Sequence, residues 1–363
     1  MPPRAIVLSL EQLSRRCLGC YGHEWIETPN LDRFASRGVV FDHCFASPIP
    51  ETEFRESSET LSNRLRQQGL VVLRKCESDA HDSDSLCDTA FSRLVAAGEQ
   101  ALLELSRDST RSWLLCLESC GIGWPGVATS EFVELYADEL DEELAADLVA
   151  IREIEVAYAA LLTQFDHVLG RLLGTVDRLF GDAPPLIVVV AAHGQGVCEE
   201  EMLSPQLDQN TEATSDAGSL RDELVHVPLL ILGATSEMLG SRRAELVTPA
   251  DVLPTLSDWF GFPPEAAAEL DAVSLLPVLR NEERPWRSEL FFDDAEGATG
   301  LRNDQFLLVV PALSGIAERD GDEATCALFL KPEDVWQVND VAAQYPDQVA
   351  NLRTALLDRR QSR

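Results

Sequence analysis

Short, almost continuous apolar runs recur along the chain and are flanked by polar or glycine-containing segments. A run of four to eight apolar residues is typical of a strand that is buried on both faces. We interpret five runs as strands: Ala5–Leu10, Leu70–Leu73, Ser112–Leu117, Pro185–Gly194 and His226–Leu232. The carboxyl ends of such strands are where ligands bind in an open α/β sheet, so the residues after each run are candidates for chemistry.

Helical periodicity fills much of the chain between these runs. Apolar residues recur every three or four positions, which indicates one packed face on each helix. The segments predicted as helical are Leu31–Arg37, Thr60–Gly69, Leu86–Leu105, Glu131–Tyr136 and Asp138–Phe180. The segment Asp208–Glu223 is acidic and polar, and we predict a loop there. The alternation of strands and helices predicts an α/β fold.

The last quarter of the chain has a different pattern. The strand-like runs Arg287–Phe292, Phe306–Val310 and Cys326–Leu330 precede a helical segment, Val341–Leu357. This order predicts a small antiparallel sheet closed by a helix. We therefore expect two units, an α/β domain over residues 1–270 and a C-terminal subdomain over residues 271–363 that packs on it.

The net charge changes the range of possible partners. The 363 residues carry a formal charge of −33, although the hydrophobic content of 45% is ordinary for a globular protein. Nucleic acids and anionic membrane surfaces require basic patches, so we exclude both as partners. A polyanionic substrate also needs a metal ion or local basic residues to offset this field. The partner remains an unknown small-molecule or protein ligand.

The expected compartment is the cytoplasm. No apolar run reaches the length of a transmembrane helix, and the first residues do not have the pattern of a signal peptide. The nine cysteines are interpreted as free thiols in a reducing compartment. The pairs Cys17/Cys20 and Cys116/Cys120 have spacings that a zinc site permits, but buried structural cysteines are the favoured interpretation.

Two motifs near the amino terminus carry a family resemblance. Residues Leu18–Gly22 read LGCYG, and residues Thr28–Phe41 read TPNLDRFASRGVVF. Both resemble the amino terminus of the sulfatases, in the alkaline phosphatase superfamily. Further similar stretches are Thr60–Gly69, Phe165–Leu173, His226–Leu232 and Leu246–Gly261. The resemblance implies an alkaline-phosphatase-like, doubly wound central sheet with helices on both faces.

The departures from the family pattern lie at the site. In sulfatases the first strand ends in aspartates that bind a divalent metal, whereas this chain has Glu11 and Gln12. A later strand ends in S-D-H-G or S-D-N-G, where this chain has Ala192 and His193. The resemblance thus implies a degenerate metal site of Glu11, Gln12 and His193. One carboxylate, an amide and an imidazole would bind a divalent cation (calcium, magnesium, manganese or zinc) with low affinity.

The nucleophile motif is also absent. No Cys or Ser between residues 44 and 58 has proline at +2 and arginine at +4, so we expect no formylglycine. Thr52 is the candidate nucleophile, because some superfamily members use threonine, but Glu51 and Glu53 would repel an anionic ester. A solvated loop threonine is the favoured interpretation. Arg55 and His226 are the candidate substrate-binding residues.

Two hypotheses follow. The favoured one is a sulfatase-like pseudoenzyme with a binding or regulatory role, because four functional elements are lost on a retained scaffold. They are the first-strand aspartates, the aspartate of S-D-H-G, the nucleophile motif and the histidine of a PHxP element, which the segment Glu118–Pro125 lacks. The alternative is a divergent metal-dependent hydrolase of sulfate or phosphate esters that uses Glu11, Gln12 and His193, with Thr52 or His226.

Overall fold

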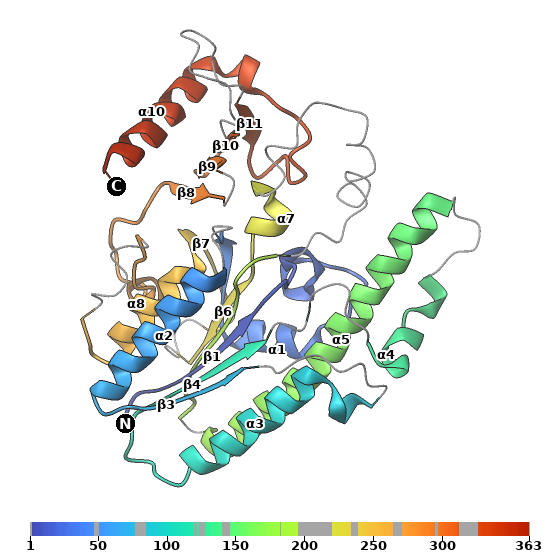
Figure 1. Ribbon diagram of the computed structural model, residues 1–363, viewed down its shortest axis with the longest axis vertical. Helices are drawn as coiled ribbons and strands as arrows, with labels where there is room; N and C mark the ends of the chain where they lie inside the picture. Colours follow the sequence, from blue (N-terminus) through green and yellow to red (C-terminus); the bar gives the residue numbers. More distant parts are fainter. Residues whose placement is uncertain are drawn as a thin grey trace.

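The computed structural model describes residues 2–46, 51–76, 85–119, 122, 128–139, 146–181, 183–194, 220–233, 239–263, 271–294, 297–311 and 326–362. For residues 51–56, 88, 139, 146–151 and 360–362 it describes only the course of the backbone. Figure 1 shows a large sheet with helices on both faces and, above one edge of it, a small sheet with a helix.

The large sheet is mixed and has seven strands, in the order β3-β4-β1-β5-β6-β2-β7. In that order the strands are Val71–Cys76, Trp113–Ser119, Arg4–Leu10, Leu186–Ala191, Leu229–Leu232, Val39–Cys44 and Ser241–Val247. β6 is antiparallel to both of its neighbours, whereas the remaining pairs are parallel. The carboxyl ends of β1, β4 and β5 therefore meet at one edge of the sheet.

Buried apolar strands explain why this sheet lies at the centre. All six residues of β5 are buried, and so are all but two of the seven residues of β1. A strand without a polar face cannot lie at a solvent-exposed surface, so helices must cover both sides. The strand predictions for Ala5–Leu10 and Pro185–Gly194 are confirmed, with ends that differ from the observed ones by at most three residues.

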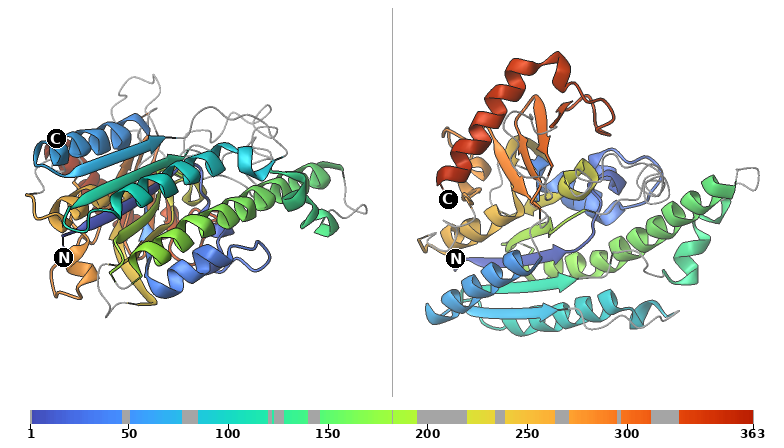
Figure 2. Two further views of the ribbon diagram at one scale, coloured as in Figure 1. Left: turned by 90° about the horizontal axis from the view of Figure 1, so that it is seen from below. Right: turned by 45° about the horizontal axis from the view of Figure 1, so that its top comes forward.

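The helices form two layers. One face of the sheet is covered by α1, α3 and α5, and the other by α2 and α8 (Figures 1 and 2). The helices are α1 (Pro29–Arg37), α2 (Glu51–Gln67), α3 (Ala90–Leu105), α4 (Ser130–Glu134), α5 (Ala146–Phe180), α7 (Asp222–Val225), α8 (Val252–Trp259), α9 (Leu276–Leu279) and α10 (Pro346–Ser362). None of the helices in the described part of the chain is long and apolar enough to cross a membrane.

The small sheet is antiparallel throughout, in the order β11-β10-β9-β8. Its strands are β8 (Leu290–Asp293), β9 (Thr299–Arg302), β10 (Phe306–Val310) and β11 (Ala327–Leu330). One face packs on α10, and the other packs on Phe45, Val225 and Leu246 from the larger unit. The fold prediction is confirmed, including the small C-terminal sheet with its helix.

Two local predictions were wrong. α2 begins at Glu51 rather than Thr60, so the helix starts nine residues earlier than predicted. The end of the expected acidic loop forms α7, in which Asp222 and Glu223 are buried. A local pattern of polar residues predicts exposure, but these two carboxylates pair with cations that are distant in the sequence.

Candidate functional site

Three strands end together at the edge of the large sheet. Leu10 of β1 is in register with Ser119 of β4 and with Ala191 of β5. Hydrogen bonds continue beyond the strands, because the Glu11 N–H donates to the Ser119 carbonyl at 3.0 Å and the Ala192 N–H donates to the Leu10 carbonyl at 2.8 Å. The backbone thus fixes Glu11 between the ends of the two neighbouring strands.

A cleft lies at this edge, between the sheet and helices α2 and α8. Its polar lining includes Glu11, Glu118, Ser119 and, from α2, Ser58 and Ser62. Its apolar lining comes from the strands and from both helices, and Ala192 lies among these residues. Glu11 and Ala192 therefore face the same space, and the position where the resemblance implies a metal-binding aspartate carries a methyl group.

Glu118 is held in a network with β3. Arg74 forms an ion pair with one oxygen of Glu118, and the Cys76 thiol donates a hydrogen bond to the other oxygen at 3.1 Å. Arg74 also reaches Ser62 of α2 at 3.4 Å. The side chains of Arg74 and Glu118 are only 13% and 15% exposed. Because the guanidinium already neutralises Glu118, it does not provide a free cation for an anionic ester.

The thiol that lines the cleft is unsuited to act as a nucleophile. Burial raises the pKa of Cys116 to about 12, so this thiol stays protonated at neutral pH. A protonated thiol is a poor nucleophile and a poor metal ligand.

Gln12 occupies a sharp turn directly after β1. Its backbone has φ of 58°, in the left-handed region. The Tyr158 hydroxyl fixes this turn, since it donates to the Gln12 carbonyl at 3.0 Å and accepts from the Ser14 N–H at 2.9 Å. Gln12 is not among the residues that line the cleft.

His193 also lies outside the cleft lining. Its Nδ1 lies 2.9 Å from the Gly194 carbonyl oxygen. The next residue must be glycine, because a Cβ at position 194 would lie 2.0 Å from the backbone oxygen of Glu223 in α7. This close approach places α7 directly against the end of β5.

The described residues do not fit a divalent metal ion. Among them, no three His, Cys, Asp or Glu side chains converge in a group that could hold one. Of the expected set, only Glu11 lines the cleft. A hard cation such as calcium requires several oxygen ligands, which one carboxylate next to a methyl group does not supply. The ligand roles of Glu11, Gln12 and His193 remain predictions.

Two of the other expected residues lie in the first turns of α2. Thr52 and Arg55 belong to this helix by their backbone, but their side chains lie outside the described part of the structure. They are on the helix that forms one wall of the cleft. Their proposed roles therefore also remain predictions.

His226 lies away from the cleft, under the small sheet. Its Nε2 is 2.7 Å from the Asp42 carbonyl oxygen, and its ring stacks on Phe45 at 4.3 Å between centroids. Burial and the nearby Arg15 guanidinium hold the pKa of His226 well below 6.5, so the ring is neutral at neutral pH.

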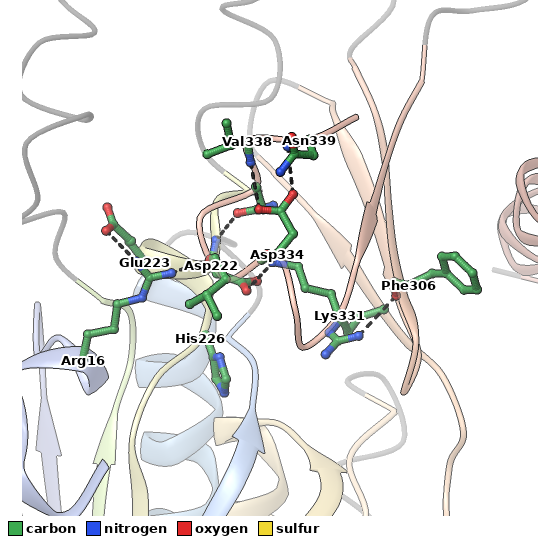
Figure 3. Close-up of polar contacts among 12 residues, drawn as sticks. Arg16, Asp222, Glu223, His226, Phe306, Lys331, Asp334, Val338 and Asn339 are labelled. Carbon is green, nitrogen blue, oxygen red and sulfur yellow. Dashed lines mark hydrogen bonds and ion pairs between the residues drawn. The ribbon is translucent and has the colours of Figure 1, made fainter. Parts of the chain in front are cut away.

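Sequence reasoning missed a buried charge cluster around α7. Lys331 donates to Asp222 at 2.5 Å and to the Asp334 carbonyl at 2.8 Å, and Arg16 pairs with Glu223 at 2.9 Å (Figure 3). Lys331 is 3% exposed, and burial lowers the pKa of its amine. The cluster connects the segment after β1, the end of β5 and the small sheet. Lys331 follows a strand-like apolar run, but nothing in the local sequence indicates its partner.

Comparison with known proteins agrees with the fold. A family model described as Sulfatase matches residues 100–262. The chain is 27% identical over 172 residues to the multifunctional alkaline phosphatase superfamily protein PehA of Trinickia caryophylli. The aligned region covers 44% of this chain and 30% of that protein. It is 23% identical over 214 residues to arylsulfatase K of Xenopus laevis, and that aligned region covers 56% of this chain and 36% of the relative.

The match thus spans about a third of the length of both curated relatives. A solved structure of a protein in complex with its substrate, D-glucosamine-2-N,6-O-disulfate, superposes with a TM-score of 0.75 at 15% identity. That superposition covers 99% of this chain and 98% of the other, so the fold is shared almost from end to end. The family-model match over residues 100–262, the curated relatives and the shared fold together support a place for this chain in the sulfatase family of the alkaline phosphatase superfamily.

Proposed function

We propose that this chain is a sulfatase-like pseudoenzyme that binds a ligand and does not hydrolyse sulfate esters. One observation supports this proposal most directly. At the adjacent ends of β1 and β5, the cleft is lined by Glu11 and by Ala192, which has no ligand atom in its side chain. A sulfate ester develops negative charge as it is cleaved, and a metal ion or fixed cations must stabilise that charge. Among the described residues, this region offers two carboxylates and one guanidinium that is already paired.

The proposal is tested by a turnover assay and a metal titration on the same protein. Chelator-treated protein is titrated calorimetrically with Ca²⁺, Mg²⁺, Mn²⁺ and Zn²⁺ at moderate salt, which screens diffuse binding to the acidic surface. The same samples are assayed with 4-nitrophenyl sulfate and 4-nitrophenyl phosphate. We expect no turnover and no stoichiometric metal site. Turnover that Glu11→Ala abolishes, while the protein stays folded, contradicts the proposal.

One observation favours the alternative of a divergent ester hydrolase. Glu11 lies at the end of β1 and lines the cleft, which is the place where the family resemblance implies the first metal ligand. A gain-of-function variant separates the two proposals. Ala192→Asp places a second carboxylate beside Glu11. Metal binding by this variant and not by the wild type supports the pseudoenzyme proposal, because it shows that the site lacks only a metal ligand. A metal site that is already present in the wild type supports the hydrolase.

A further inference from the structure

Away from the cleft, α7, the end of β2 and the small sheet meet at a junction that contains a histidine. The His226 ring stacks on Phe45, with 4.3 Å between the ring centroids and an interplanar angle of 24°. Phe45 belongs to the apolar cluster in which the small sheet packs on the larger unit, and its ring lies 5.8 Å from that of Phe292 in β8. His226 therefore lies against a residue on which the small sheet docks.

Hydrogen bonds hold α7 in this junction from both sides. On the side of β2, the Ala46 N–H donates to the Val225 carbonyl at 2.7 Å. On the side of the small sheet, the Asp222 N–H donates to the Gln337 side chain at 2.6 Å, and Lys331 forms an ion pair with the Asp222 carboxylate. α7 thus links the large sheet to the C-terminal subdomain, and a displacement of α7 loosens that link.

The hydrogen bond of the ring determines which nitrogen acid protonates. Nε2 of His226 lies 2.7 Å from the Asp42 carbonyl oxygen, which can only accept. In the neutral ring Nε2 therefore carries the proton, and Nδ1 is the atom that gains one in acid. Figure 3 shows the ring next to the ion pairs of α7 and turned away from them.

Several groups that face the ring are cationic. Burial makes the largest contribution to the lowered pKa of His226, and Arg15, His43 and Arg302 lower it further. The bond to the Asp42 carbonyl acts in the opposite direction. The His43 ring lies 6.3 Å away. Arg302 is 3% exposed, and although burial lowers its pKa to about 10, the guanidinium stays charged at neutral pH and below.

The carboxylates around the junction are paired with other cations. Among the described residues, these ion pairs are Arg242–Asp42, Lys331–Asp222 and Arg16–Glu223. A proton added to the ring would have to compete with a guanidinium or an amine for each of these carboxylates. The closed junction therefore favours the neutral ring.

We propose that His226 is an acid-sensitive switch for the docking of α7 and the small sheet on the large sheet. The neutral ring donates to Asp42 and stacks on Phe45, which keeps the junction closed. A proton on Nδ1 adds a charge near Arg15 and Arg302, and an open junction in which water hydrates the ring becomes more favourable. The switch is independent of the proposed function, because the junction lies outside the cleft.

The direction of the pH dependence follows from linkage. The pKa of His226 in the closed state lies below the 6.5 of a hydrated histidine, so the closed state binds fewer protons than the open one. Closure is fully favoured above about pH 6.5 and weakens as the pH falls through and below that value.

Hydrogen–deuterium exchange of the full chain tests the switch. Peptides that contain Ala46 or Asp222 report on the junction, and peptides from β1 report on the central sheet. After correction for the intrinsic pH dependence of exchange, we expect the junction to open about 10-fold more at pH 5.5 than at pH 7, with β1 unchanged. A junction that does not respond to pH, or an equal change in β1, overturns the inference.

Variants assign the response to one ring. His226→Gln retains an N–H donor for the Asp42 carbonyl but does not titrate, so its junction should open equally at pH 7 and pH 5.5. His167→Gln is the matched control, because this histidine is exposed on α5, and it should retain the response of the wild type. An undiminished acid response in His226→Gln overturns the inference.

A pH series on the wild type needs no variant to fold. The opening of the junction should be constant above about pH 7.5 and should increase below about pH 6.5, by at most about 10-fold per pH unit for one proton. An increase that begins only below about pH 5 assigns the response to carboxylates such as Asp222 and overturns the role of His226.

Discussion

Four carboxylates illustrate two different uses of charge in this molecule. Asp166 and Asp251 are almost fully buried and lie within dense hydrogen-bond networks that join distant elements. Glu11 and Glu118 are half-buried, line the cleft and lie at the ends of strands. The first pair stabilises the scaffold, whereas the second pair lines a cleft. Asp166 and Asp251 lie in stretches that resemble the sulfatases, whereas Glu11 stands where the family pattern has an aspartate.

Asp166 connects α5 to the start of α1. One carboxylate oxygen accepts from the Leu31 N–H at 2.7 Å, and the other accepts from the Asn30 N–H at 3.0 Å and the Asn30 amide at 2.9 Å. Gly170, one turn later, is required because a Cβ there would lie 2.7 Å from the Asn30 side chain. The motifs TPNLD and FDHVLGRLL (Phe165–Leu173) thus form one contact between residues 136 positions apart.

Asp251 has an equivalent role at the start of α8. It accepts from the N–H groups of Thr248 at 2.8 Å and Val273 at 2.7 Å, and it forms an ion pair with Arg287 at 2.6 Å. This arrangement includes a capping box with Thr248. Such a residue is retained because the fold requires it, and its presence carries no information about catalysis.

The largest expected effect is that of Asp251→Ala. The substitution leaves the Arg287 guanidinium, only 15% exposed, without its partner and removes the capping-box bond of the turn Pro249–Asp251 that precedes α8. We expect the free energy of unfolding to fall by about 3–5 kcal/mol, the usual cost of breaking a buried ion pair. Urea denaturation measures it, with Asp258→Ala on the exposed side of α8 as control. A loss below that of the control contradicts the structural role.

Asp166→Ala should have a smaller effect. It leaves the first N–H groups of α1 and the Asn30 amide without acceptors, but no buried cation is left unpaired. We expect a loss of about 2–3 kcal/mol by the same denaturation measurement. The exposed Asp177, paired with Arg37, is the matched control on the same helix, since such surface pairs contribute about 0–1 kcal/mol. Equal losses from the two substitutions would contradict the distinction.

Glu11→Gln should have the smallest effect on stability. The strand ends are held by backbone hydrogen bonds that the substitution retains, and the amide has the same shape as the carboxylate. We expect the free energy of unfolding to change by less than about 1 kcal/mol. Thermal and urea denaturation check this value. A loss as large as that of Asp166→Ala would place Glu11 with the scaffold carboxylates and weaken its assignment to a ligand site.

The sequence was sufficient to predict the fold because its apolar runs are unambiguous. Strands such as Leu186–Ala191 have no polar face, so they can only be central, and their carboxyl ends locate the edge of the sheet. The prediction of Glu11 at that edge followed from the position of a single run. The interpretation of Ala192 as a lost ligand also depended on alignment with the family motif.

The cleft itself could not be predicted from sequence. Arg74 and Lys75 are adjacent basic residues on β3, and strand alternation turns Arg74 toward Glu118. That choice depends on the exact register of β3 against β4, which an apolar pattern of four residues does not determine. The buried pairs of α7 were missed for a related reason, since each joins residues more than 100 positions apart.

The position of Lys331 also has a consequence for the order in which the chain is synthesised. Asp222 emerges from the ribosome 109 residues before the amine that neutralises it. Until that amine arrives, Asp222 lacks its ion-pair partner, and docking of α7 carries a desolvation penalty. Glu223, the residue after Asp222, pairs with Arg16, which has been translated long before it. The central strands can therefore form early on a nascent chain, whereas the part of the edge beside Gly194 matures only after the small sheet has been translated.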